Sequence, residues 1–218
     1  MLPPTVAIIG AGPLGRWLAL SAARAGFRVT LEDVMPANLH HAQEALRAVL
    51  GPDGPGMVGQ GFSPDIKIAK SAGDLSPEVC FSDGYPISLV STIEEAVRNA
   101  VLVIDCVPDE LESKLEILWL LDRMAPPRTV LATPTTRLSI ADLASCTYRP
   151  AKCIAIAAEA SALTGNPQAG TGNAPAARPE IQLRTTTQTA PETIALLDHF
   201  WHQLGFTPVF QPDPARQP

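Results

Sequence analysis

The chain has 218 residues and a formal net charge of −6 at pH 7. This length suits one large domain with a buried core, and the acidic balance without a basic stripe argues against a nucleic-acid-binding protein. No apolar run is long enough to cross a membrane. The first expected strand begins at Thr5, which leaves no room for a signal peptide, so we expect a cytoplasmic protein.

No metal site is expected from the cysteines and histidines. The four cysteines show no C-x-x-C spacing, and Cys106 and Cys153 lie inside apolar runs, as buried free thiols do. The four histidines fall on two expected helices without a carboxylate or cysteine that would complete a ligand set. They are His40, His41, His199 and His202.

The first thirty-three residues carry the strongest motif. An apolar run at 5–9 leads into Gly10-Ala-Gly12-Pro-Leu-Gly15, followed by a helical stretch at 16–25 and a second apolar run at 27–31. Gly10 permits a tight turn, Gly12 lets a pyrophosphate approach the backbone, and Gly15 lets the helix pack closely. Because Glu32 and Asp33 end the second run at the distance expected for a ribose-binding acid, the pattern predicts a dinucleotide-binding βαβ unit.

The rest of the chain alternates between helical and strand patterns. Further helices are expected at 36–50, 110–124, 139–144 and 191–204, the last capped by Thr189. A short helix should also begin after Thr92, which is a suitable N-cap residue. Further strands are expected at 88–91, 101–107, 129–133, 152–158, 180–185 and 206–210, with a possible short one at 65–69. The helix at 110–124 should bury an apolar face, and the tryptophans should lie in the core. The face consists of Leu111, Leu115, Leu118, Trp119 and Leu121, and the tryptophans are Trp17, Trp119 and Trp201.

This alternation indicates an α/β fold with a Rossmann-type doubly wound, mostly parallel sheet and helices on both faces. We expect a single dinucleotide-binding domain at 1–211 and a disordered tail at 212–218. Residues 51–86 should form an irregular excursion, because 51–64 is rich in glycine and proline and 71–86 has no clear period.

The order of motifs resembles the N-terminal NAD-binding domain of the L-3-hydroxyacyl-CoA dehydrogenases. The similar segments lie between about Thr5 and Phe210, and 51–86 matches poorly. They are 6–15, 29–33, 104–109 followed by Lys114, 126–132, 138–141 and 204–209. The Val-Pro-acid turn with a lysine five residues later, and the Leu-Ser-Ile-Ala segment, are the most particular of these features.

The resemblance implies NAD as the cofactor and assigns residues to it. Asp33 takes the position that binds the adenosine ribose, while Asp109 and Lys114 take positions near the nicotinamide ribose. The full implied cofactor set is Gly10, Gly12, Pro13, Leu14, Gly15, Asp33, Val107, Asp109 and Lys114. From the residues alone, either Glu32 or Asp33 could face the ribose. No arginine closely follows Asp33, which disfavours NADP.

On the catalytic side the chain departs from the family pattern. The family's Ser-Asn-Thr-Ser-Ser segment reads Thr-Pro-Thr-Thr-Arg at 133–137, where Thr136 replaces a serine that binds the substrate oxygen. The general-base histidine falls at Ala157, and the glutamate that orients it falls near Gln182. An alanine accepts no proton, and Glu159, two residues on, is the nearest substitute base.

Three functions therefore remain open. The first is an NAD-dependent oxidoreductase of fatty acid metabolism that moves hydride between NAD and a 3-hydroxyacyl-type substrate, such as an acyl-CoA, with an altered catalytic set. The second is a non-catalytic NAD(H)-binding module, either a sensor or a subunit. The third is an FAD-binding protein, because the glycine loop with Glu32 also fits a flavin fingerprint. We expect no counterpart in this sequence of the family's C-terminal helical domain, which usually forms a dimer, so both a homodimer and a partner subunit stay open.

Overall fold

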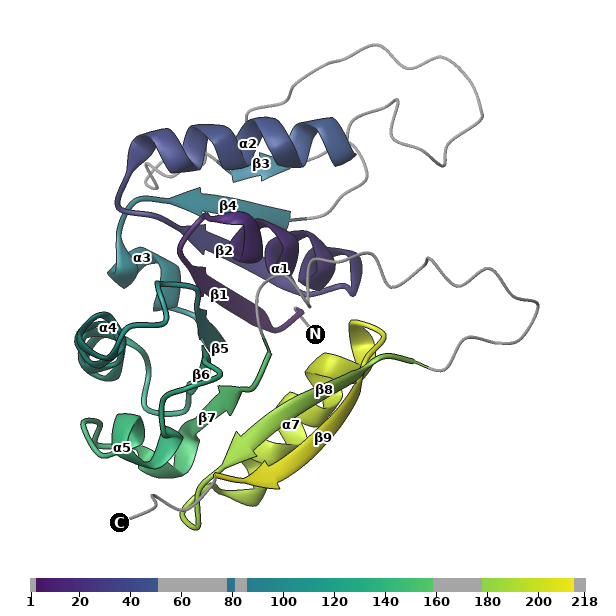
Figure 1. The fold of residues 1–218 in the computed structure, drawn as a ribbon. Coiled ribbons are helices and arrows are strands. Elements are labelled where there is room, and N and C mark those ends of the chain that lie inside the picture. The colour runs from purple at the N-terminus through teal and green to yellow at the C-terminus, as the bar shows by residue number, and fades with distance from the viewer. Residues whose placement is uncertain (1–2, 51–77, 81–85, 159–177, 214–218) are drawn as a thin grey trace.

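The computed structural model describes residues 3–50, 78–80, 86–158 and 178–213 (Figure 1). The strands are β1 (Thr5–Ile9), β2 (Arg28–Glu32), β3 (Glu78–Cys80), β4 (Pro86–Val90), β5 (Ala100–Asp105), β6 (Val130–Pro134), β7 (Cys153–Ile156), β8 (Glu180–Thr185) and β9 (Thr207–Pro212). The helices are α1 (Pro13–Arg24), α2 (Pro36–Leu50), α3 (Ile93–Val97), α4 (Leu111–Met124), α5 (Ile140–Ala144) and α7 (Pro191–Gln203), with a short 3-10 turn, η1 (Pro150–Lys152).

Within the described residues, nine strands form one sheet in the order β3-β4-β2-β1-β5-β6-β7-β8-β9. The six strands from β4 to β7 are parallel, and the chain winds outward from β1 in one direction and then from β5 in the other. A crevice at the carboxyl ends of β1 and β5 follows from this reversal. The predicted Rossmann-type α/β fold is confirmed.

Both edges of the sheet depart from parallel pairing. At one edge β3 runs antiparallel to β4, and at the other β8 runs antiparallel to β7, with β9 parallel to β8. Strand β3 was not predicted, because it is only three residues long and residues 71–86 show no clear period. Residues 51–77 and 81–85, including the expected strand at 65–69, lie outside the described residues.

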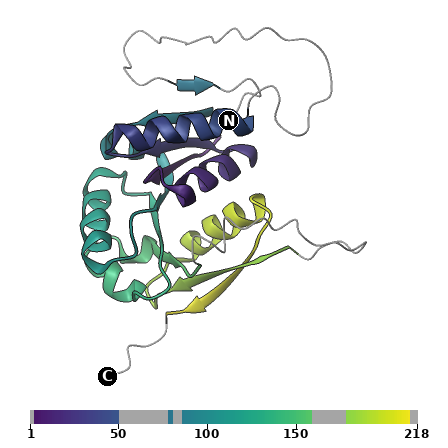
Figure 2. The ribbon, with the colours of Figure 1, turned by 45° about the horizontal axis from the view of Figure 1, so that its top comes forward.

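The sheet separates two apolar cores. Along β1, Val6 and Ile8 pack into one core while Ala7 and Ile9 pack into the other, because successive side chains point to opposite faces. The first core takes in buried residues of α1, α2 and α7, and the second those of α3, α4 and α5. The two groups of helices lie on different sides of the sheet (Figures 1 and 2). Burial on both faces explains why the central strands read as continuous apolar runs.

Most element boundaries match the sequence patterns. Helix α2 and strand β8 have the expected bounds, and Thr92 caps α3 by accepting a hydrogen bond from the Glu95 amide at 3.4 Å. The N-cap of α7 is Ala190 rather than Thr189, whose hydroxyl instead accepts a bond from the Thr186 amide. Strand β9 continues to Pro212, and the Asp213 amide donates to the Thr185 carbonyl, so the chain is ordered beyond the expected end at 211.

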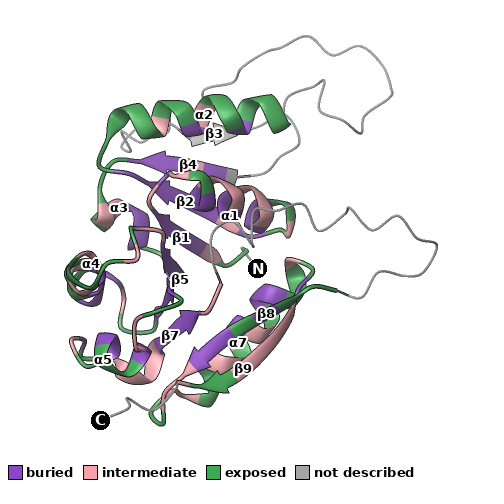
Figure 3. Cartoon of the chain, viewed as in Figure 1, coloured by how far each residue is buried: buried purple, intermediate pink, exposed green. Residues whose placement is uncertain are grey.

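The expected buried face of α4 is partly wrong. Exposed positions occur along α4 (Figure 3). Leu111 and Trp119 are 50% and 48% exposed, and Arg123 lies 4.8 Å from the centre of the Trp119 ring. Leu118 and Leu121 are buried as expected, and Leu115 is partly buried against the core. The rest of the buried stripe consists of Lys114, Ile117 and Asp122, which the apolar pattern did not predict. The apolar pattern misled because two positions of the true stripe carry charged side chains, each neutralised by a partner elsewhere in the chain.

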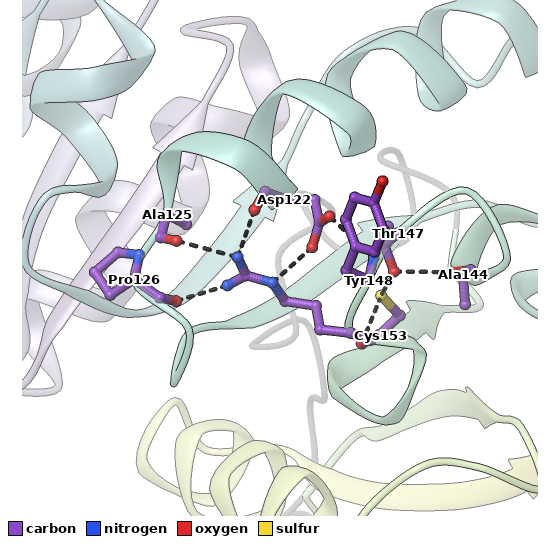
Figure 4. Close-up of polar contacts among 8 residues, drawn as sticks. Asp122, Ala125, Pro126, Ala144, Thr147, Tyr148 and Cys153 are labelled. Atoms are coloured by element: carbon purple, nitrogen blue, oxygen red, sulfur yellow. Dashed lines mark hydrogen bonds and ion pairs between the residues drawn. The ribbon is translucent and has the colours of Figure 1, made fainter.

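One of these partners is Arg149, which precedes β7. Its Nε donates to Asp122 Oδ1 at 2.7 Å and its Nη1 to the Pro126 carbonyl at 2.6 Å, while the Tyr148 amide donates to Asp122 Oδ2 at 2.9 Å (Figure 4). Arg149 Nη2 donates to the carbonyls of Asp122, in the last turn of α4, and of Ala125, the C-cap, so the guanidinium satisfies carbonyls that the end of the helix leaves unpaired. This contact fixes α4 against the entry to β7.

Trp17 is half-buried, whereas Trp201 is fully buried and its ring lies 5.3 Å from Phe200 and 5.5 Å from Phe206. We predict that Trp201→Ala lowers the free energy of unfolding by about 3–5 kcal/mol, because it opens a large cavity in the core. Trp119→Ala removes an exposed ring and should cost no more than about 1 kcal/mol. Urea denaturation of both variants measures the difference, and equal losses would contradict the assignment of the two rings.

Candidate functional site

A pocket of about 570 Å³ opens beside the carboxyl ends of β1, β5 and β6. Its wall combines the glycine loop, the turn after β5 and the segment after β6. The lining residues are Gly12, Pro13, Leu14, Gly15, Cys106, Val107, Pro108, Asp109, Pro134, Thr135, Thr136, Arg137 and Ala158. The site therefore lies where the winding direction of the sheet reverses, as expected for a dinucleotide.

The three glycines have separate physical roles. Gly10 has a φ of +102°, which other residues rarely adopt. A Cβ on Gly15 would lie 1.8 Å from the Gly10 carbonyl oxygen, so only glycine permits this approach of α1 to the end of β1. A Cβ on Gly12 would meet nothing within 4 Å, and Gly12 lines the pocket. The absence of a side chain at Gly12 therefore leaves space for a ligand.

Helix α1 begins at the pocket with Pro13 in its first turn and no acidic residue there. Pro13 has no N–H, and the amides of Leu14 and Gly15 belong to the first turn, where backbone donors lack helical partners. These donors and the positive end of the helix dipole favour an anion at this position.

Asp33 is bound to the glycine loop. Its Oδ2 accepts a hydrogen bond from the Ala11 amide at 2.9 Å, its Oδ1 accepts one from the Met35 amide at 2.8 Å, and both oxygens accept from Asn38 Nδ2 at 3.1 Å. Glu32 contributes its backbone carbonyl instead, which accepts from the Gly10 amide. Of the two acids left open by the sequence, Asp33 is the one whose carboxylate contacts the loop.

Asp109 lies across the pocket from the glycine loop. Its Oδ2 accepts a hydrogen bond from the Thr136 amide at 3.3 Å, which joins the turn after β5 to the segment after β6. Its Oδ1 is buried and has no partner within the part of the chain that the structure describes. A ribose hydroxyl would satisfy this acceptor. Together with the open space at Gly12, this orphaned oxygen fits the expected dinucleotide.

Lys114 is not part of the pocket wall. Its side chain is fully buried, and its Nζ forms an ion pair with Oδ1 of Asp105, which is also fully buried. Burial raises the pKa of the Asp105 carboxyl, although the Lys114 charge opposes this effect. The same region contains Cys106, a pocket residue whose thiol pKa is also raised by burial and by Asp105. A raised pKa disfavours the thiolate, which is the reactive form of a cysteine.

The segment at 133–137 forms the third side of the pocket. Thr133 and Thr135 are buried, whereas Thr136 and Arg137 are exposed, and Pro134 carries no side-chain amide. Arg184 Nη2 donates to the Thr135 carbonyl at 2.7 Å, and its Nη1 forms an ion pair with Asp213 at 3.3 Å. This arginine fastens the segment to the end of β9.

Ala157 and Gln182 are neighbours across the antiparallel pair β7–β8. Ala155 pairs with Arg184 and Ile156 with Leu183, and the Ala157 amide donates to the Gln182 carbonyl at 2.8 Å. The resemblance placed a histidine and its orienting glutamate at these two positions, so the fold brings the expected pair of positions together. Glu159 lies outside the described residues.

The structure thus brings seven of the eleven predicted site residues into one pocket wall: Gly12, Pro13, Leu14, Gly15, Val107, Asp109 and Thr136. Gly10 and Asp33 do not line the pocket, but their hydrogen bonds hold the glycine loop in place. Asp105 and Arg137 were not predicted as residues of the site. The available signal for Asp105 was its place in an apolar run, nine positions before Lys114. No local pattern marked Arg137 as a pocket residue.

Three cysteines, Cys106, Cys146 and Cys153, are free thiols. Among the residues described, no group of histidines, cysteines or acids is arranged to hold a metal ion. The described helices also include none with the length and apolar character needed to cross a membrane.

We predict that Lys114→Met lowers the free energy of unfolding by about 3–5 kcal/mol, because it leaves the Asp105 charge buried without a partner. Combining Lys114→Met with Asp105→Asn should recover much of this loss, since neither charge then remains. Denaturation measures both effects. Unchanged stability together with weakened NADH binding would instead favour the expected ribose contact of Lys114.

Glu32 is 4% exposed, and burial, with a smaller contribution from Asp33, raises the pKa of its carboxyl to about 7. Because this value exceeds that of the unfolded chain, ionisation of Glu32 should destabilise the fold as the pH rises from about 4.5 to 7. Glu32→Gln should therefore gain about 2–3 kcal/mol relative to the parent chain above pH 7 and little below pH 4.5. Urea denaturation between pH 4.5 and 8 tests this, with the exposed Glu116→Gln as control. A pH-independent difference would disprove the assignment.

Comparison with known proteins agrees with this geometry. The family model described as "3-hydroxyacyl-CoA dehydrogenase, NAD binding domain" matches residues 5–157. A probable 3-hydroxybutyryl-CoA dehydrogenase of Bacillus subtilis (strain 168) is 31% identical over 149 residues, which are 68% of this chain and 46% of that protein. A lambda-crystallin homolog of Bos taurus is 29% identical over 209 residues, which are 95% of this chain and 56% of that protein.

Among solved structures, the (S)-3-hydroxybutyryl-CoA dehydrogenase PaaH1 from Ralstonia eutropha has the same fold, with a TM-score of 0.71 and 20% identity. The match covers 97% of this chain and 64% of that one. The present chain spans about half the length of the curated relatives it matches. On the family match and the pocket geometry, the chain belongs to the 3-hydroxyacyl-CoA dehydrogenase family and contains its NAD-binding domain.

Proposed function

We propose that this chain binds NAD(H) in the pocket between the glycine loop and Asp109, for hydride exchange with a 3-hydroxyacyl-type substrate. One observation carries the proposal: Gly12, Asp109 and Thr136 line the same pocket. Bound NAD would supply the hydride acceptor, and the protein would supply the binding and orientation. Family membership supports the nicotinamide cofactor over the flavin alternative.

Each part of the wall has a role in this proposal. The open space at Gly12 and the first-turn amides of α1 suit the pyrophosphate. The carboxylate of Asp33 suits the adenosine ribose, whose hydroxyls would replace the Asn38 amide. The unpartnered Oδ1 of Asp109 suits the nicotinamide ribose. The exposed Thr136 hydroxyl suits the substrate oxygen that gains or loses the proton.

The residues at the expected positions of the general base and its partner support a second candidate, a non-catalytic NAD(H)-binding module. Ala157 offers no proton acceptor, and its cross-strand neighbour Gln182 does not titrate. Without a positioned base, the hydride step would lose about 10²–10⁴ in rate. Glu159 remains the proposed substitute base for an active enzyme. The proposed dehydrogenase would act on an acyl-CoA substrate in fatty acid metabolism. We also propose a cytoplasmic location and assembly as a homodimer or with a partner subunit.

An NADH fluorescence titration tests cofactor binding. We predict that Asp33→Ala weakens NADH binding by about 10–100-fold, because it removes charge-assisted hydrogen bonds to the ribose. Gly12→Ala should also weaken binding while leaving the melting temperature almost unchanged, since its methyl group enters the pocket. Glu32→Gln is the matched control and should stay within about twofold of the parent affinity. A larger effect of Glu32→Gln than of Asp33→Ala would reverse the assignment of the ribose acid.

Addition of acetoacetyl-CoA to the NADH complex separates the two candidates. Binding of NADH without its consumption would support the non-catalytic module. Steady consumption that Glu159→Gln abolishes would support the dehydrogenase. Absence of NADH binding would refute the proposal and leave flavin as the next ligand to titrate.

A further inference from the structure

The pocket wall contains a cation that the cofactor contacts above do not use. Among the described residues that line the pocket, Asp109 and Arg137 are the ones that carry a charge. Arg137 Nη2 donates to the backbone carbonyl of Asp109 at 3.1 Å, which ties the guanidinium to the opposite turn. Within the described part of the chain, Arg137 has no carboxylate within ion-pair distance.

The backbone on either side of Arg137 is held by hydrogen bonds. The Thr135 amide donates to the Ile156 carbonyl at 3.0 Å, and the Leu138 amide donates to Thr135 Oγ1 at 3.0 Å. Arg184 of β8 donates to the Thr135 carbonyl, so Thr135 is fixed to both β7 and β8, and Leu138 is fixed to Thr135. A guanidinium mounted in this way loses less entropy when it binds a ligand than a freely moving surface arginine would.

The chemistry of this group indicates its ligand. A guanidinium with one nitrogen anchored presents its remaining N–H groups as a planar fork, which matches the two oxygens of a carboxylate. The neighbouring Thr136 offers a hydroxyl to a second oxygen of the same molecule. A neutral thioester would leave the arginine without a counter-charge once ligands displaced water from the pocket, which is unfavourable.

We propose that Thr136 and Arg137 form a substrate subsite for a short 3-oxo or 3-hydroxy acid that carries a free carboxylate. The carboxylate binds Arg137 and the 3-oxygen binds Thr136. This inference rests on the proposed function, because it names the substrate class of the same pocket. The cofactor pyrophosphate is the other anion that Arg137 could reach, but the glycine loop and the start of α1 already provide donors for it.

Acetoacetate and methyl acetoacetate form a suitable probe pair, because they share the 3-oxo group and differ in the negative charge. Calorimetric titration of each into the full chain, with and without saturating NADH, measures binding independently of turnover. The parent chain should bind acetoacetate at least about tenfold more tightly than the ester, as expected for a charge-assisted hydrogen bond.

Three variants locate the effect. Arg137→Met should weaken acetoacetate binding by about 10–100-fold and leave the ester and NADH within about twofold of the parent affinity. Arg137→Lys keeps the charge but not the fork, so its loss should be intermediate. Arg128→Met removes the same charge from an exposed position outside the pocket and should change neither ligand. Melting temperatures confirm that each variant is folded.

The outcomes distinguish this inference from the proposed function. Equal affinity for acid and ester, or no binding of acetoacetate to the parent chain, would overturn the carboxylate subsite even if NADH binds. A tenfold loss of NADH affinity in Arg137→Met would overturn it by assigning the arginine to the pyrophosphate. Arg137-dependent binding of acetoacetate without any NADH binding would support the subsite and refute the cofactor proposal.

Discussion

The buried ion pair between Lys114 and Asp105 is the contact on which the pocket depends most. It joins the last residue of β5 to the first turn of α4, and the turn that carries Val107 and Asp109 lies between those two ends. Removing two charges from water is costly, and their attraction compensates only when the geometry is maintained. The pair therefore fixes both ends of the turn, and with them the position from which Asp109 reaches Thr136.

The opposite wall depends on backbone geometry rather than on charge. The contact of Gly15 with the Gly10 carbonyl sets the distance between α1 and β1, and the bond from Ala11 to Asp33 sets the loop against β2. Side chains are not required to form this half of the site, apart from the carboxylate of Asp33. It follows that a short glycine pattern specifies nearly all of it.

This difference explains what the sequence could predict. The glycine loop and the continuous apolar strands were readable because each depends on local spacing, whereas the choice between Glu32 and Asp33 stayed open until the Asp33 carboxylate was seen to contact the loop. The buried face of α4 was misread because it contains Lys114 and Asp122, whose partners Asp105 and Arg149 become neighbours only in the folded chain. Strand β3 was missed because three residues are too few to show a period, and only pairing with β4 identifies them.

The two halves of the pocket also tolerate substitution differently. The cofactor half uses backbone amides and positions that only glycine can occupy, so few changes preserve it. The proposed substrate half uses side chains at strand ends, where Pro134, Arg137, Ala157 and Gln182 are expected from the resemblance to depart from the family pattern, and where β6, β7 and β8 pair in register. A fold that keeps its dinucleotide half and exchanges the side chains opposite can change its substrate, or lose its proton transfer, without losing the cofactor.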